Sequence, residues 1–163
     1  MIEDSGRIEG IWIKRAHRGP MDAVREATLI AGRGLEGSVD RSRRRQVTVL
    51  EREAWEQCEA QVGGTADPSR RRANILVSGL RLARTRGRVL MIGSARIVVG
   101  GELTPCERME EVLPGLQEAM RPDWRGGVFG QVIADGRIRI GDRIEWESDT
   151  TLADNALTPA SRR

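Results

Sequence analysis

Short runs of β-branched and aliphatic residues, separated by glycine-rich or polar stretches, dominate the hydrophobic pattern of the chain. Such runs are typical of strands bounded by turns. The pattern predicts strands over residues 8–13, 27–30, 46–50, 74–77, 89–92, 96–99, 129–133, 137–140 and 143–146. Many short strands at close spacing favour a barrel or a sandwich. We therefore predict a mainly β fold with short helices (α+β), built on a closed or partly closed β-barrel.

Two of the turns between these runs indicate hairpins. Gly93-Ser94 lies between the strands predicted over 89–92 and 96–99. Asp135-Gly136 precedes the strand predicted over 137–140, and an Asp-Gly pair is the stronger hairpin signal of the two.

Two segments follow a helical pattern instead. Residues 51–62 place Trp55, Cys58 and Val62 on one face, and the glycines that follow Val62 would end that helix. The second segment begins with Thr104-Pro105-Cys106-Glu107, which has the form of a capping box. Threonine would cap the helix, proline would be its first residue and cysteine its second. Apolar residues continue the pattern, and a second turn follows Pro114-Gly115 at residues 116–120.

The capping box gives Cys106 a chemical interpretation. Unpaired N–H groups at a helix start favour negative charge, and a thiol there reacts more readily as the thiolate. Arg108 would add to this effect. Cys106 would then serve as a nucleophile, a sulfur carrier or a soft metal ligand, whereas the alternative is a small buried hydrophobic residue. Cys58 lies on the apolar helix face, and we expect it in the core.

The composition is that of an ordinary globular protein. Of 163 residues, 39% are hydrophobic and 31% are charged. We expect one domain over residues 1–147 and a polar tail over 148–163. No apolar stretch is long enough to cross a membrane, and the acidic start is unlike a signal peptide. These features predict a cytoplasmic protein with no membrane partner.

Arginine dominates the basic side chains, because Lys14 is the only lysine. Two clusters, residues 41–45 and 70–72, directly precede predicted strands. Guanidinium groups suit phosphate or carboxylate, although a basic run is also typical of a solvated loop. A net charge of +3, no tyrosine and a single phenylalanine, Phe129, make nucleic acid an unfavourable partner.

Several other site classes are disfavoured or excluded. Two cysteines and one histidine cannot supply a structural zinc site. No phosphate-binding loop of the G-x-x-x-x-G-K-[ST] type is present. The glycine-rich stretch over residues 125–130 could expose N–H groups to an anion, or it could serve a turn.

Several short motifs, in order, resemble the MOSC domain, which forms the C-terminal part of molybdenum cofactor sulfurases. They are Gly34-Leu35-Glu36-Gly37, the stretch 45–51, Arg72-Ala73-Asn74-Ile75, Gly93, Pro105-Cys106 and Gly141-Asp142. The resemblance covers about residues 6–146. It implies a β-barrel of the MOSC or pyruvate-kinase β-barrel-like type and binding of the molybdenum cofactor (molybdopterin).

The resemblance also implies roles for particular residues. Cys106 matches the family's cysteine, which is proposed to carry sulfur as a persulfide in the sulfurases. In the reductase relatives, which act on N-hydroxylated substrates, a similar cysteine binds molybdenum directly. Arg72 and Asn74 match the arginine-x-asparagine motif and are expected to hold the cofactor's phosphate or pterin edge. Arg45, Thr104 and Arg108 are further candidates for binding the cofactor.

One motif departs from the family. Many members follow Gly-Leu-Glu-Gly with aspartate and histidine, whereas Ser38-Val39-Asp40-Arg41 follows here, so either Asp40 takes a shifted role or the site is altered. A chain without an aminotransferase-like, flavin or iron–sulfur part would need a sulfur or electron donor protein. The competing hypothesis is a non-catalytic module that binds an anion or nucleic acid through the arginine clusters.

Overall fold

The chain folds mainly into strands, with helical segments in two stretches between them. The strands are β1 (Ser5–Lys14), β2 (Met21–Val24), β3 (Glu26–Ile30), β4 (Gly34–Leu35), β5 (Val47–Glu51), β6 (Ile75–Ser78), β7 (Val89–Ile92), β8 (Ala95–Glu102), β9 (Val128–Ala134), β10 (Gly136–Arg139) and β11 (Arg143–Trp146). The helices are α1 (Arg52–Val62), α2 (Arg108–Val112) and α3 (Leu116–Ala119), with 3-10 turns η1 (Pro68–Arg71) and η2 (Pro122–Trp124). The computed structural model describes residues 5–39 and 42–148.

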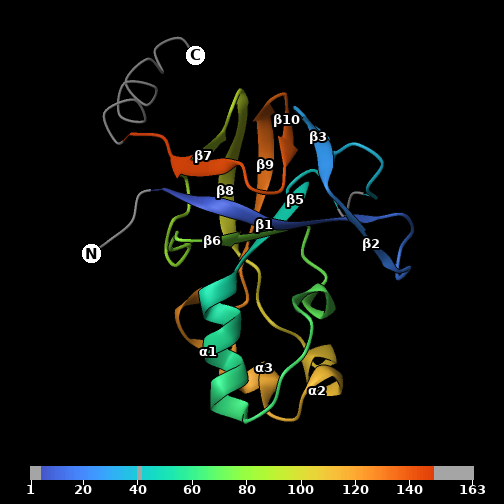
Figure 1. Cartoon of the computed structure of the whole chain (residues 1–163), viewed down its shortest axis with the longest axis vertical. Coiled ribbons are helices and arrows are strands. Elements are labelled where there is room, and N and C mark those ends of the chain that lie inside the picture. Colours follow the sequence, from blue (N-terminus) through green and yellow to red (C-terminus); the bar gives the residue numbers. More distant parts are fainter. Residues whose placement is uncertain (1–4, 40–41, 149–163) are drawn as a thin grey trace.

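Seven of these strands close into a barrel. Their order is β11-β7-β8-β9-β5-β6-β1, and antiparallel pairing of β1 with β11 completes the ring. β2 extends the sheet beside β1, while β10, β3 and β4 form a smaller sheet next to the barrel (Figure 1). The predicted mainly β fold and closed barrel are therefore confirmed.

Alternating side chains fill the barrel. In β8 the residues Ala95, Ile97 and Val99 are buried, and the residues between them are partly exposed. This two-residue period is what a strand with one face on a core requires. The core inside the ring also includes residues of β1, β5, β6, β7, β9 and β11.

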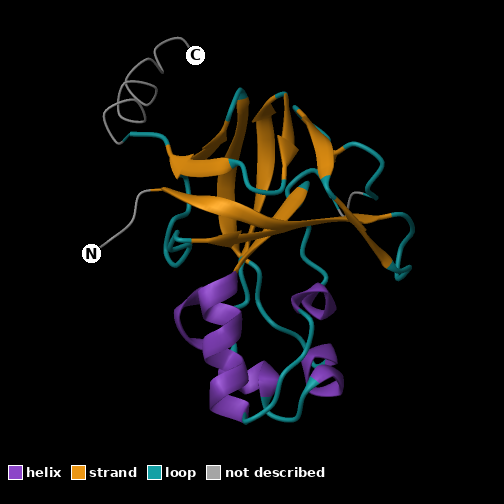
Figure 2. Cartoon of the chain, in the orientation of Figure 1, coloured by secondary structure: helices purple, strands orange, loops and turns teal. Residues whose placement is uncertain are grey.

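The helices gather at one end of the barrel (Figure 2). Trp55 and Cys58 of α1 are almost fully buried there, and Leu116 of α3 packs in the same cluster. Gly63 ends α1 in the left-handed conformation, with φ at 74°. The predicted helix and the buried position of Cys58 are therefore confirmed. No helix among the described residues is long and apolar enough to cross a membrane.

One predicted hairpin is confirmed and the other is wrong. β7 pairs with β8 across the Gly93-Ser94 turn. The strand after Asp135-Gly136, however, pairs with β3 and not with β9. Gly136 lacks the positive φ of a type I′ turn, and a Cβ there would lie 2.6 Å from the Ala95 nitrogen. The glycine is required for close packing on the β7–β8 turn instead.

Candidate functional site

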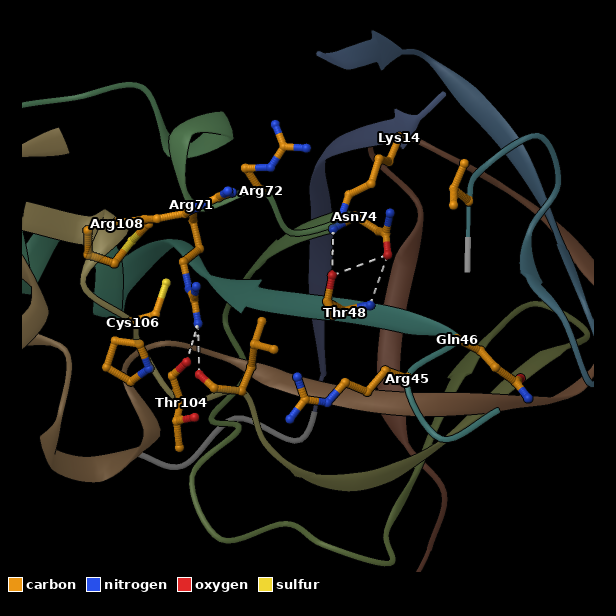
Figure 3. A pocket seen from close by; sticks show the side chains of 14 residues that line it. Lys14, Arg45, Gln46, Thr48, Arg71, Arg72, Asn74, Thr104, Cys106 and Arg108 are labelled. Carbon is orange, nitrogen blue, oxygen red and sulfur yellow. Dashed lines mark hydrogen bonds between the residues drawn. The ribbon is translucent and has the colours of Figure 1, made fainter. Parts of the chain in front are cut away.

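A pocket of about 300 Å³ lies between the barrel and the loop that follows β8 (Figure 3). It is lined by Lys14, Val39, Arg45, Gln46, Thr48, Arg71, Arg72, Asn74, Leu103, Thr104, Pro105, Cys106, Arg108 and Met109. Every residue that the sequence suggested for the site lines this pocket: Cys106, Arg45, Arg72, Asn74, Thr104 and Arg108. The barrel thus brings together three segments that are far apart in the sequence.

Strand direction explains why the two arginine clusters meet. β5 and β6 are parallel neighbours, with Val49 opposite Ile75. Segments that precede parallel neighbours start from the same edge of a sheet, so Arg45 before β5 and Arg72 before β6 reach one pocket. Only some arginines of the two clusters line the pocket. Arg44 packs over Phe129 and Arg70 lies outside the pocket lining, while Arg41 is outside the described residues.

Asn74 ties the pocket wall together. Its Oδ1 accepts hydrogen bonds from the Thr48 backbone N–H and hydroxyl, at 3.0 and 3.2 Å. Its Nδ2 donates to the Trp12 carbonyl at 3.2 Å and to the Ser38 hydroxyl at 3.5 Å. With its amide engaged on both ends, Asn74 fixes the positions of β1, β5 and the Ser38 segment at the pocket wall.

Ser38 occupies the motif that departs from the family pattern. Its hydroxyl accepts a hydrogen bond from the Lys14 backbone N–H at 3.1 Å, in addition to its contact with Asn74. The segment that lacks the family histidine is therefore connected to the pocket through a hydroxyl group. Asp40, for which a shifted role was one alternative, lies outside the described residues.

The predicted capping box around Cys106 is wrong. α2 begins at Arg108, its N-cap residue is Glu107, and no side chain caps it. Cys106 precedes the helix, and its carbonyl accepts the Met109 N–H at 2.9 Å. The carbonyl of Thr104 is turned toward Arg71, at 3.4 Å, so this backbone does not enter the helix. The argument from the helix start therefore does not apply to this thiol.

Cys106 is an exposed thiol in the pocket, unlike Cys58. In Figure 3 it lies with Arg108 toward one end of the pocket, and Lys14 and Asn74 lie toward the other. The alternative that Cys106 is a small buried hydrophobic residue is therefore wrong.

Arg71 is a pocket residue that the sequence did not single out. Its side chain lies between the barrel and the loop before α2, and the residue is only 7% exposed. Burial lowers the pKa of Arg71 to about 10, while the neighbouring Cys106 raises it and Arg45 lowers it. The guanidinium therefore remains charged at neutral pH, directly beside the thiol end of the pocket. A run of three arginines gives no sign of which one is buried.

The pocket lining is strongly cationic. Its charged members are Lys14, Arg45, Arg71, Arg72 and Arg108, and no carboxylate occurs among the described lining residues. Lys14 is also buried, at 6% exposure. Low-dielectric walls lined by one sign of charge concentrate ligands of the opposite sign. The pocket is therefore suited to an anion with several negative groups.

Metal ligands and the glycine-rich stretch over residues 125–130 were also considered from the sequence. Among the described residues no group of three or more His, Cys, Asp or Glu side chains could hold a metal ion. The glycine-rich stretch after Arg125 does not line the pocket. Its Gly127 N–H donates to the Trp124 carbonyl, and its Gly126 carbonyl accepts from Arg71. These two glycines therefore form a turn outside the pocket lining.

A family model described as the MOSC domain matches residues 15–145 of the chain. Among curated proteins, none matches significantly. Among solved structures, the YuaD protein from Bacillus subtilis is 22% identical with a TM-score of 0.76, over 88% of this chain and 96% of that chain. YiiM from Escherichia coli is 20% identical with a TM-score of 0.63, over 87% of this chain and 70% of that chain. YiiM from Geobacillus stearothermophilus is 15% identical with a TM-score of 0.69, over 88% and 75%. At these identities the likeness to solved structures concerns the fold alone.

Proposed function

The chain belongs to the MOSC domain family, which is associated with the molybdenum cofactor, and we propose that it binds this cofactor in the pocket around Cys106. One observation carries the proposal. An exposed thiol shares a pocket with several cationic side chains, and the described lining has no carboxylate. This donor set fits a ligand with a phosphate at one end and a thiophilic metal at the other.

The basic residues would hold the anionic parts of the cofactor. Arg72 and Arg45 offer planar forks that suit a phosphate, and Lys14 offers a compact charge. Asn74 would act mainly by fixing the wall, because its amide already bonds to protein groups on both ends. Thr104 and Arg108 border the thiol and would contact the ligand on that side.

Cys106 would carry the chemistry in one of two ways. As a metal ligand, its thiolate would donate an electron pair to the molybdenum, whose redox activity the cofactor supplies when bound. As a sulfur carrier, the thiolate would attack the terminal sulfur of a donor's persulfide. The Cys106 S–S bond would form as the donor's S–S bond breaks, and the donor would leave as a thiolate. Either cycle requires a donor, of electrons in the first case and of a persulfide sulfur in the second.

Metal and pterin content test the proposal directly. The chain would be expressed in cells that make the cofactor, and molybdenum would be measured by elemental analysis and pterin by fluorescence after oxidation. We expect both to co-purify with the wild-type chain. Arg72→Ala should lower the content of both, whereas Arg70→Ala, an exposed neighbour outside the pocket lining, should not.

The Cys106→Ser variant separates the two roles. Loss of molybdenum with retention of the pterin would favour a metal ligand and a reductase. Retention of both, together with a persulfide on wild-type Cys106 after treatment with a persulfide donor, would favour sulfur transfer. If neither molybdenum nor pterin accompanies the wild-type chain, cofactor binding is refuted.

The competing hypothesis of nucleic-acid binding gains no support from the fold. Phe129 is 6% exposed and lies under Arg44 and Arg45, so it offers no platform for stacking a base.

A further inference from the structure

Arg71 joins two separate backbone segments near Cys106. Its Nε donates to the Gly126 carbonyl at 2.9 Å. Its Nη2 donates to the Leu103 carbonyl at 2.8 Å and to the Thr104 carbonyl at 3.4 Å. One buried guanidinium from the end of η1 therefore ties the loop after β8 to the segment before β9, and Figure 3 draws its bond to Thr104 of that loop.

The segment that presents the Gly126 carbonyl is shaped for this contact. Asp123 and Trp124 have positive φ angles of 53° and 55°, which side chains other than glycine rarely adopt. A Cβ on Gly126 would lie 2.7 Å from the Leu103 oxygen and 3.1 Å from Arg71 Nη2. Strained backbone of this kind persists where the surrounding structure holds it, commonly beside a functional site.

The position of Arg71 also sets a charge at the thiol end of the pocket. Arg71 and Cys106 both line the pocket, and they are close enough to interact electrostatically. Arg45 and Arg108, which also line the pocket, are exposed and therefore screened by solvent, whereas Arg71 is buried. A buried charge held by several hydrogen bonds acts at short range with little screening.

We propose that Arg71 is a positioning and specificity residue of this site, which fixes the backbone of the Cys106 loop and directs anionic reactants to the thiol. The inference rests on the proposed function in taking Cys106 as the working thiol. It adds that reactants at Cys106, whether cofactor or sulfur donor, must present negative charge to this end of the pocket.

Two alkylating reagents of different charge test the specificity role on the cofactor-free chain. Iodoacetate and iodoacetamide form the same S–C bond and release iodide, but only iodoacetate is anionic. The ratio of their rates at Cys106, measured by mass spectrometry, cancels changes in the exposure or ionisation of the thiol. We expect Arg71→Met to lower this ratio about fivefold. Arg70→Met, the matched control, should leave it within about twofold of wild type.

A charge-preserving variant tests the positioning role. Arg71→Lys keeps the charge but loses the planar fork, so it should keep most of the rate ratio. It should speed hydrogen exchange at the Leu103 amide, which donates to the Gly127 carbonyl at 2.8 Å, by about tenfold. Labelling of buried Cys58 reports loss of the fold in the same samples.

Three results would overturn the inference. They are an unchanged rate ratio in folded Arg71→Met, an equal fall in Arg70→Met, and unchanged Leu103 exchange in Arg71→Lys. Should Arg71→Met unfold and expose Cys58, Arg71→Gln, which removes the charge but keeps hydrogen-bond donors, replaces it in the rate-ratio test. Absence of molybdenum from the purified chain would refute the cofactor proposal and leave these measurements intact, so the two failures are distinguishable.

Discussion

Asn74 illustrates how a single polar side chain organises the pocket at the scale of one residue. It is half-buried and bonds to Thr48 on β5, to Trp12 on β1 and to Ser38. A buried polar group that loses its partner costs more than the bond itself contributes, because the partner left behind is not solvated. The wall of the pocket therefore depends on Asn74 even without a ligand.

We expect Asn74→Ala to lower the free energy of unfolding by roughly 2 kcal/mol. Asn74→Asp keeps the oxygen that faces Thr48 but replaces the donor that faces the Trp12 carbonyl, so it should also destabilise the fold. Urea unfolding followed by tryptophan fluorescence measures both effects. Gln57→Ala, on the exposed face of α1, is the control, and an equal loss of stability there would contradict the assigned role.

Glu51, at the end of β5, links stability to pH. Burial raises the pKa of its carboxyl, and the hydrogen bond from the Leu82 N–H lowers it by less. The folded state therefore binds a proton at Glu51 more readily than the unfolded state does. By linkage, this residue's contribution to stability is greatest when it is protonated and is lost as pH rises above the ordinary value of 4.5.

We expect Glu51→Gln to stabilise the protein at neutral pH, because the amide oxygen can still accept the Leu82 N–H without a buried charge. The gain should shrink as pH falls from about 8 to 4, and urea unfolding across that range measures it. Glu53→Gln, at an exposed carboxylate that accepts the Gly79 N–H, controls for removing a negative charge nearby. A gain that does not vary with pH would refute the assignment.

At the scale of elements, the strands were predictable and some of their connections were not. The alternating runs identify most strands because burial of one face imposes the two-residue period. β2 and β4 were missed, since β2 has no fully buried residue and β4 is only two residues long. The wrong hairpin at Asp135-Gly136 and the displaced start of α2 share a cause. Each local signal was overridden by a tertiary contact, with Ala95 in one case and Arg71 in the other.

The turn before β9 can be tested by replacing Gly126 with alanine. A Cβ would crowd the Leu103 oxygen and the Arg71 guanidinium, so Gly126→Ala should cost about 2–3 kcal/mol of unfolding free energy. It should also speed labelling of Cys106, because the loop on which the thiol lies would shift. Chemical denaturation and iodoacetamide labelling measure the two effects.

Gly64→Ala is the matched control for Gly126→Ala. Its Cβ would meet only the flexible end of Leu113, at 3.1 Å, and its φ is not positive. We expect a change within about 0.5 kcal/mol there. A similar loss of stability in both variants would mean that Gly126 has no special role.

At the scale of the whole molecule, the site depends on the order in which the barrel strands pair. The residues that the sequence suggested come from segments around residues 45, 72 and 106, and parallel pairing of β5 with β6 brings the first two together. The motifs could identify these segments, but they could not show that Arg71 and Lys14 are buried beside them. Burial of a charged side chain depends on the packing of all surrounding segments, which no local pattern encodes.

The barrel and the helical end also share strands. Val49 and Ile75 face the core inside the barrel, whereas their neighbours Leu50 and Leu76 face the core beneath the helices. Alternate residues of β5 and β6 therefore pack in the two different cores. Unfolding of either core would disrupt these strands and so expose the other core. We therefore expect one cooperative unfolding transition, without an intermediate in which only the helices have melted.

Leu116→Ala tests this coupling. Leu116 is fully buried under the helices, and its truncation should cost about 2–5 kcal/mol. The midpoints of Cys58 labelling, which reports the helical end, and of hydrogen exchange at the β7 and β8 amides, which reports the strands of the barrel, should fall together in urea. Leu116 lies outside the pocket lining, so native Cys106 should react at its wild-type rate. Exposure of Cys58 at clearly lower urea than loss of the strand signal would show that the two cores unfold separately and that the shared strands do not couple them.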